Sequence, residues 1–397
     1  MHLPARAAVV LGSLALLVGG SIPAAYGESE RADVVGHVYV NDNTAGTNTI
    51  GAFDRHKNGS LTAMAGSPFS AGGAGAGAIV GSQGALQISG DGRFLLAVDA
   101  GSNEISVLRI GTGGSLEPVT GSPVASGGIL PISIAIHDDL VYVANEGNGS
   151  TGSNYTGFTL SSTGMLTPLA NSTFPLSATA LPGDVLFNST GTKLVGTEVG
   201  PANGPSFIDS FDVAHDGRLT PASGSPFQAQ AVGPFGSQFR PTDPSELYVS
   251  NAHAGANAGS VSAYRVSSNA ALSPIGGSPF ADKQTASCWV EITPDGRFLF
   301  TVNTGVPSIS RYQIMSNGAL SLLGSTVFND PTGLRPFDAR LDPSGKTLYV
   351  VDAGLAMVSA FDVDGGNLSE LDSSPIALPA GATPFGIVVT RTGRDDG

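Results

Sequence analysis

The sequence contains one cysteine, Cys288, among 397 residues. A lone thiol excludes an intramolecular disulfide, so packing and strand pairing must hold the fold together. Cys288 lies in the apolar segment 287–290, where cysteine serves as a small buried hydrophobe more often than as a catalytic thiol. We therefore expect neither a disulfide framework nor thiol chemistry.

Basic residues are also scarce, with 18 Lys and Arg against 32 Asp and Glu and a formal net charge of −14. A surplus of acid disfavours binding to nucleic acids and to anionic membranes. The six histidines are scattered, without the short spacings at which histidines ligate a metal ion together. The composition thus favours a small molecule, a glycan or a protein as the partner, and no nucleic acid.

Long apolar runs are lacking except near the start of the chain. There, Arg6 precedes an apolar run at 7–20 and a small-residue segment at 23–27. This order predicts a signal peptide over residues 1–27; a retained anchor is the alternative, although the run is short for a membrane span. We expect a secreted protein, extracellular or periplasmic, whose mature chain has no membrane span. The mature chain should begin with a polar lead-in at 28–35 and end with a tail at 391–397.

Turn-forming residues are abundant instead, with 55 glycines and 26 prolines. In residues 336–378, strands predicted at 337–341, 347–351 and 357–363 are separated by the turns 342–345 and 352–354, and the third alternates apolar and polar residues. A fourth strand begins at Leu368, after the turn 364–366. Four short strands joined by tight turns predict an all-β unit.

This four-stranded unit recurs along the chain. A leucine after a Gly- or Ala-containing turn marks the fourth strand at steps of 48 to 55 residues, and a Gly-Ser-Pro-Phe-like segment follows it; the leucines are Leu61, Leu116, Leu166, Leu219, Leu272, Leu320 and Leu368. Seven copies at this period predict a seven-bladed β-propeller. We expect blades at about 36–80, 81–130, 131–177, 178–232, 233–284, 285–334 and 335–380.

The two ends of the repeat region complement each other. Residues 36–40 match a second strand, so the first unit lacks its first strand, whereas residues 383–389 match a first strand with no unit after it. We therefore expect residues 383–390 to pair into the first blade and close a ring spanning 36–390, which removes the open sheet edge between the ends. Such a closed ring is expected to be a monomer.

Every predicted second strand ends in Asn, Asp or Glu. These residues are Asn41, Asp99, Asn145, Glu198, Asn251, Asn303 and Asp352. Turn formation explains most of them, because Asn and Asp bond to their own backbone. The alternative is a ring of oxygens near the axis, which is what Ca²⁺ requires. Glu198 breaks the Asn/Asp rule and is therefore the member of most interest.

Loops that leave the second strands of blades 3, 4 and 5 are the longest, at 146–154, 200–206 and 253–259. Because scaffolded loops collect binding groups, we expect any site on that side. Glu198, Glu146 and His253 are the candidate catalytic residues there.

First strands open with Pro in five blades. The residues two positions after the start of the first strands are expected at the mouth of the central channel. Asp184, Trp289 and Asp338 from this set are candidate ligand-binding residues. Trp289 suits stacking on a sugar ring, but a core position between blades is the alternative. Deeper in the strands, Glu291 and Arg340 are expected to form a buried ion pair between adjacent blades.

The segments Thr-Pro-Asp-Gly-Arg-Phe-Leu-Phe at 293–300 and Asp-Pro-Ser-Gly-Lys-Thr-Leu-Tyr-Val at 342–350, with the Gly-Ser-Pro-Phe segments, resemble the seven-bladed lactonase family. That family includes bacterial 6-phosphogluconolactonase and fungal carboxymuconate-lactonizing enzyme. The resemblance covers residues 36–390 and implies a propeller that acts on a cyclic ester.

The resemblance also implies catalytic residues that this sequence does not carry. The family's His in the first strand of blade 4 is matched by Gly183, and its Arg-His pair opening blade 5 by Phe235 and Gly236. Its Glu in blade 5 and Arg in blade 6 are matched by Ala252 and Thr304. Since a lactone carbonyl needs a general base or acid and a cation, we expect the family mechanism to be absent.

Three functions remain open from the sequence. The first is a secreted propeller that binds a small molecule, glycan or protein on its top face without catalysis. The alternative is a lactone hydrolase or cyclase that uses other residues, with or without Ca²⁺. The third is a structural repeat protein of the cell envelope.

Overall fold

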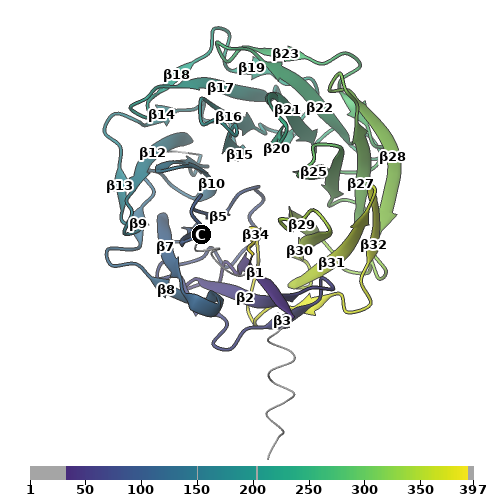
Figure 1. The fold of residues 1–397 in the computed structure, drawn as a ribbon. Helices are drawn as coiled ribbons and strands as arrows, with labels where there is room; N and C mark the ends of the chain where they lie inside the picture. Colours follow the sequence, from purple (N-terminus) through teal and green to yellow (C-terminus); the bar gives the residue numbers. More distant parts are fainter. Residues whose placement is uncertain (1–32, 150, 203, 392–397) are drawn as a thin grey trace, which may run out of the picture.

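The computed structural model describes residues 33–149, 151–202 and 204–391. The predicted signal peptide at 1–27, most of the lead-in and residues 392–397 lie outside this part. Seven antiparallel sheets stand around a central axis (Figure 1), which confirms the predicted all-β propeller. Within the described residues the one helical element is a 3₁₀ turn, η1 (Thr112–Gly114), and no helix is long and apolar enough to cross a membrane.

Each blade places its first strand next to the axis. In chain order of the blades these inner strands are β34 (Ile387–Val389), β5 (Leu86–Ile88), β10 (Pro131–His137), β15 (Pro182–Phe187), β20 (Pro234–Arg240), β25 (Ser287–Ile292) and β29 (Pro336–Leu341). The second strands are β1 (Val34–Asn41), β6 (Phe94–Asp99), β11 (Leu140–Asn145), β16 (Lys193–Glu198), β21 (Asp243–Asn251), β26 (Phe298–Asn303) and β30 (Thr347–Asp352).

The third and fourth strands lie toward the outside of the ring. The third strands are β2 (Thr49–His56), β7 (Glu104–Ile110), β12 (Asn154–Leu160), β17 (Phe207–Val213), β22 (Ser260–Val266), β27 (Ser308–Ile314) and β31 (Met357–Asp364). The outermost strands are β3 (Leu61–Ala63) with β4 (Phe69–Ser70), β8 (Leu116–Pro118) with β9 (Val124–Ala125), β13 (Leu166–Pro168) with β14 (Phe174–Pro175), β18 (Leu219–Pro221) with β19 (Phe227–Gln228), β23 (Leu272–Pro274) with β24 (Phe280–Ala281), β28 (Leu320–Val327), and β32 (Asn367–Glu370) with β33 (Ile376–Ala377).

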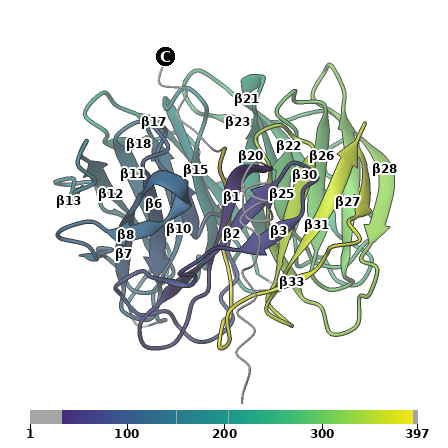
Figure 2. The ribbon, with the colours of Figure 1, turned by 60° about the horizontal axis from the view of Figure 1, so that its bottom comes forward.

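The outermost strand therefore differs from the single strand predicted. In six blades it is split into two short pieces that both pair with the third strand, and only blade 6, within the described chain, keeps it whole as β28. In four of the split blades the first piece ends in proline, which has no N–H for a strand ladder and so ends the regular pairing. Figure 2 shows the blades from the side, with β28 at the outer edge.

The ring closes as the sequence predicts. β34 pairs antiparallel with β1, Val38 opposite Val389 and Val40 opposite Ile387, and supplies the first strand that blade 1 lacks. Hydrogen bonds from Phe385 N to Asn41 O and from Thr390 N to His37 O extend this pairing at both ends. The C-terminal strand thus makes blade 1 a complete sheet.

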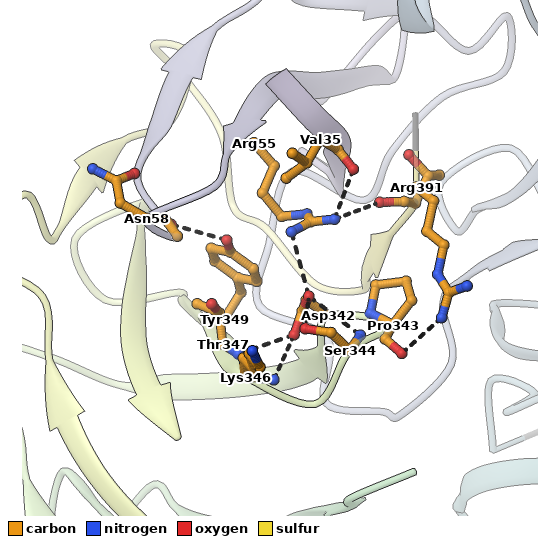
Figure 3. Close-up of polar contacts among 12 residues, drawn as sticks. Val35, Arg55, Asn58, Asp342, Pro343, Ser344, Lys346, Thr347, Tyr349 and Arg391 are labelled. Atoms are coloured by element: carbon orange, nitrogen blue, oxygen red, sulfur yellow. Dashed lines mark hydrogen bonds and ion pairs between the residues drawn. The ribbon is translucent and has the colours of Figure 1, made fainter. Parts of the chain in front are cut away.

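A buried arginine also joins blade 1 to blade 7, beside Thr390, which follows β34 (Figure 3). Arg55 of blade 1 forms an ion pair with Asp342 of blade 7 at 3.3 Å, and it donates to the carbonyls of Val35 at 2.9 Å and Thr390 at 3.3 Å. Tyr349 adds a hydrogen bond from its hydroxyl to Gly59 O at 2.9 Å. Blades 1 and 7 are therefore joined by polar contacts as well as by the closing strand.

Candidate functional site

The end of the ring at which the second strands finish is here called the top face. Glu198 is the last residue of β16 there, and Glu146 and His253 follow the ends of β11 and β21. Glu146 is half-buried, and burial raises the pKa of its carboxyl, whereas His253 is exposed and partial burial lowers its pKa. Of these three candidates, Glu198 is the one whose side chain contacts a second titratable group, Asp209.

The seven residues that end the second strands are engaged in local hydrogen bonds. Most bond to the next strand of their own blade: Asn145 to Asn154 and Thr156, Asn251 to Ser260 and Ser262, Asn303 to Ser308 and Ser310, and Asp99 to Ser106. Asn41 instead donates to Val98 O of the next blade, and Asp352 accepts from the N–H groups of Arg335 and Leu355.

In those bonds the asparagines use their amide nitrogens, and Oδ1 of Asn145 has no hydrogen-bond partner among the described residues. In the described part of the chain, no group of three or more His, Cys, Asp or Glu residues lies close enough to hold a metal ion. The predicted Ca²⁺ ring, made mostly of asparagine oxygens, stays a prediction.

Blade 4 departs from the pattern of its neighbours. Five blades place a hydroxyl side chain two register positions below the end of the second strand, namely Ser106, Thr156, Ser262, Ser310 and Ser359. Blade 4 places Asp209 there, opposite Gly196, and ends its second strand in Glu198. Where blades 3, 5 and 6 have an amide and a hydroxyl, blade 4 has two carboxyl groups.

The two carboxyls are buried and hydrogen-bonded to each other. Burial, reinforced by the charge of Glu198, raises the pKa of Asp209 to about 8, and burial also raises the pKa of Glu198. Two carboxylates so close cannot both ionise at neutral pH. With its pKa raised to about 8, Asp209 keeps its proton at neutral pH and shares it with Glu198 in the hydrogen bond between them.

A tyrosine of blade 3 completes this pair. Tyr155, on β12, is fully buried and donates its hydroxyl to Asp209 Oδ2 at 3.1 Å. A Cβ atom at Gly196 would lie 2.1 Å from that hydroxyl oxygen, so only glycine at this position lets the tyrosine reach across the blade interface. Glu198 lies nearer the top face than Asp209, because its register partner is Phe207, two residues before Asp209.

The central channel is filled by a stretch of the chain that precedes β5. Residues 80–85, here called the plug, enter the middle of the ring beside β5 (Figure 1) and bond to several inner strands. Gln83 donates from its backbone N to Gly183 O and from Nε2 to Ser237 O, and its Oε1 accepts from Val290 N at 3.0 Å. One residue of the plug thereby ties blades 4, 5 and 6 together.

The three predicted ligand-binding residues lie in the interior around this plug. Trp289 is 2% exposed, packs between Phe235 and Phe337, and donates from Nε1 to Ser82 O at 2.7 Å. Asp184 and Asp338 are equally buried. As the fold places them, none of the three presents a surface on which a ligand could bind at the channel mouth, and Trp289 has the core position that the sequence left as its alternative.

Their surroundings are polar and acidic. Asp184 accepts hydrogen bonds from the backbone N and hydroxyl of Ser237, and burial raises the pKa of Asp184 to about 7. Glu291 and Arg340 form the predicted ion pair, at 3.2 Å, and burial still raises the pKa of Glu291 to about 7. These contacts support a structural role for Asp184 and Glu291, whereas Oδ2 of Asp338 is buried without a hydrogen-bond partner among the described residues.

Positions that match the lactonase family's catalytic residues are closed as well. A Cβ at Gly236 would lie 2.2 Å from Gln83 Oε1, and a Cβ at Gly183 would lie 2.8 Å from Val199 Cγ2. Thr304 donates its hydroxyl to Pro336 O at 2.9 Å. The plug and neighbouring side chains therefore fill the space in which basic side chains would have to stand.

The sequence alone singled out Glu198 but missed its partner. Asp209 stands in the middle of a strand, without a turn or a motif around it. The signal that would have found it is the alignment of the third strands, in which Asp209 is the acid among hydroxyl residues.

A family model described as a seven-bladed β-propeller lactonase matches residues 37–178 and 203–394. The unmatched interval, 179–202, contains β15, β16 and Glu198. Glu198 therefore lies in a stretch that departs from the family pattern, whereas Asp209 lies in the part that the family model matches.

Solved structures share the fold over nearly the whole chain. A putative 6-phosphogluconolactonase from Bacteroides uniformis has a TM-score of 0.71 at 20% identity, covering 90% of this chain and 100% of that one. One from Bacteroides fragilis has a TM-score of 0.70 at 20% identity, covering 90% and 99%. The periplasmic gluconolactonase of Pseudomonas aeruginosa has a TM-score of 0.70 at 16% identity, covering 90% and 100%. A search among curated proteins found no match.

Proposed function

Because the chain belongs to the seven-bladed β-propeller lactonase family, we propose that it hydrolyses the cyclic ester of a sugar acid. The names of its structural neighbours, 6-phosphogluconolactonase and gluconolactonase, support this substrate class. The observation that carries the proposal is the proton-sharing pair Glu198–Asp209 in a propeller of this family.

Hydrolysis of a lactone needs a group that takes a proton from water and a proton for the leaving alcohol. In our proposal the ionised carboxylate of the pair accepts a proton from water as the water oxygen bonds to the carbonyl carbon. The ring C–O bond then breaks, and the leaving oxygen receives the proton that the pair holds. One water is consumed and one hydroxy acid is released.

Tyr155 acts through Asp209 in this scheme. Its hydroxyl hydrogen bond to Oδ2 fixes the orientation of the Asp209 carboxyl, so the shared proton stays directed toward Glu198. Glu198 is nearer the top face and 4% exposed, against 1% for Asp209, so we assign the contact with water and substrate to Glu198 as the less buried member.

Acid release by the purified protein from a panel of sugar and simple lactones tests the proposal, measured with Ca²⁺ and with EDTA. We expect turnover in both conditions, because the pair needs no metal. Glu198→Gln should lose at least about 100-fold in rate, as is typical when a general base is removed. No turnover of any lactone would contradict the proposal, whereas full activity of Glu198→Gln would contradict only the assignment of the residue.

A second candidate is a propeller that binds a small molecule, glycan or protein without catalysis. The closed family positions favour it, since Gln83 of the plug fills the space at Gly236 and Val199 fills the space at Gly183. Binding of the same lactones or of glycans without acid release, measured by calorimetry, would support this candidate.

We also propose that the protein is exported, on the charged, apolar and small-residue order of residues 1–27. Mass spectrometry of the protein recovered from its native host should find an N-terminus near residue 28. An intact Met1 in an envelope fraction would instead indicate a retained anchor.

A further inference from the structure

The outer edge of blade 6 differs from the other edges of the ring. β28 spans eight residues, Leu320–Val327, with a β-bulge at Leu323, and pairs on one side only, with β27. The described chain shows no other hydrogen-bond partner for the backbone of 320–327. A long edge strand of this kind offers a row of free N–H and C=O groups.

Five of the other six blades protect this edge, whereas blade 1 ends its first outer piece in Ala63. Blades 2 to 5 end the first outer piece in Pro118, Pro168, Pro221 and Pro274, and blade 7 ends it in the charged Glu370. Proline and charge are the devices by which edge strands avoid pairing with another chain. Blade 6 has Leu322 at the corresponding position, because Leu322 pairs with Tyr312 as Pro274 pairs with Tyr264 in blade 5.

This register shows which way the backbone points. Proline is tolerated at the position in four blades, and proline has no N–H to give to the ladder. The N–H at this register therefore points away from the third strand, and in blade 6 the N–H of Leu322 points away from β27.

The strand β28 itself is apolar and carries no charge. Residues 312–329 contain no Asp, Glu, Lys, Arg or His, although the protein carries a formal charge of −14, and the charged side chains nearby are Arg311 on β27 and Glu370 of blade 7. Of the eight large hydrophobic residues exposed in the described chain, four belong to blade 6: Val306, Met315, Leu323 and Val327, the last two being 42% and 56% exposed. Blade 6 thus concentrates exposed apolar surface that other blades lack.

We propose that β28 pairs antiparallel with the β28 of a second copy, so that two blade 6 sheets join into one eight-stranded sheet across a two-fold axis. The strand is about 26 Å long at ~3.3 Å per residue. An antiparallel pair of identical strands is self-complementary. Because both copies are acidic, an uncharged strip is where they can approach without local repulsion. This dimer replaces the monomer expected from the sequence.

Sedimentation velocity over a concentration series, from about 1 to several hundred micromolar, tests the dimer. We expect the wild-type protein to shift from monomer to dimer within that range. Leu322→Pro copies the residue of blades 2 to 5, removes the outward N–H and should leave a monomer throughout. Leu323→Lys places a charge on the exposed edge and should do the same if the proline variant fails to fold.

Met165→Lys is the matched control, since Met165 is 54% exposed beside β13 of blade 3 and the same charge there should leave the dimer intact. Unchanged fluorescence of Trp289 would show that each variant keeps its fold. A wild-type protein that stays monomeric over the whole range would overturn the proposal, and β28 would then be an edge for pairing with a different protein. A dimer that persists in both β28 variants would overturn it as well.

Discussion

Replacing Asp209 with Asn should stabilise the protein at alkaline pH, although Asp209 is buried. Its pKa is raised to about 8 in the folded protein, first by burial and then by the charge of Glu198, whereas an unfolded chain has a value near 4. Between about pH 4 and 8 the folded state therefore holds a proton that the unfolded state has released. The free energy of unfolding then falls by about 1.4 kcal/mol for each pH unit as the pH rises through that window.

The full window corresponds to a loss of roughly 5 kcal/mol, which is a ceiling because water and local relaxation reduce it. Asn at 209 removes the titration but keeps the geometry, since its amide can donate to Glu198 and its carbonyl can accept from Tyr155. We expect Asp209→Asn to exceed the wild type by about 2 kcal/mol or more at pH 9. Near pH 5, where the wild-type pair holds its proton, the difference should be below about 1 kcal/mol.

Urea unfolding at pH 5, 7 and 9 measures this difference, with the fluorescence of Trp289, the sole tryptophan, as the reporter. Burial also raises the pKa values of Asp184 and Glu291 to about 7. Both residues are present in wild type and variant, so their contributions to the pH dependence of stability cancel in the comparison. Asp364→Asn is the control, because it removes the same formal charge from an exposed position. An equal loss of stability in wild type and Asp209→Asn between pH 5 and 9 would refute the shared proton.

Three further changes test the ring and its plug. Arg55→Met removes a buried ion pair and two hydrogen bonds to carbonyls and should lower the free energy of unfolding in urea by about 3 kcal/mol. The exposed control Arg297→Met should lower it by less than about 1 kcal/mol. Equal effects would contradict a stabilising role of Arg55 between blades 1 and 7. Gly236→Ala forces a methyl group against Gln83 and should expose Trp289, seen as a red shift of its emission; an unshifted spectrum would argue against the plug. Deleting residues 383–397 removes β34 and should lower the melting temperature sharply, and an unchanged value would refute closure by the C-terminal strand.

Most of the fold could be predicted because it repeats. The marker leucines, the turn segments and the unmatched strands at the two ends are local patterns, and they were enough to place the blades and the closing strand. The Glu291–Arg340 pair could be predicted too, since adjacent blades place equivalent positions side by side.

The plug could not be predicted, because its contacts have no period. Gln83 bonds to residues 100 to about 200 positions away, across the axis, and no local pattern marks such contacts. The burial of Asp184, Trp289 and Asp338 follows from the plug and was missed for the same reason.

One of the two carboxyl residues of the candidate site, Glu198, could be predicted from the sequence. Glu198 stood out because it breaks the Asn/Asp rule at the end of the second strands, but Asp209 required the register between β16 and β17. Its hydrogen bond from Tyr155 depends on packing between two blades, which sequence periodicity does not report.

The most direct test is the initial rate of lactone hydrolysis at pH 6.5 by wild type, Asp209→Asn and the exposed control Asp364→Asn, after subtraction of spontaneous hydrolysis. If the Glu198–Asp209 pair performs the proton transfer, Asp364→Asn should match the wild type and Asp209→Asn, although folded, should lose at least about 100-fold. Equal rates for all three proteins would contradict the assignment of this pair, and the absence of hydrolysis by the wild type would contradict the proposed activity.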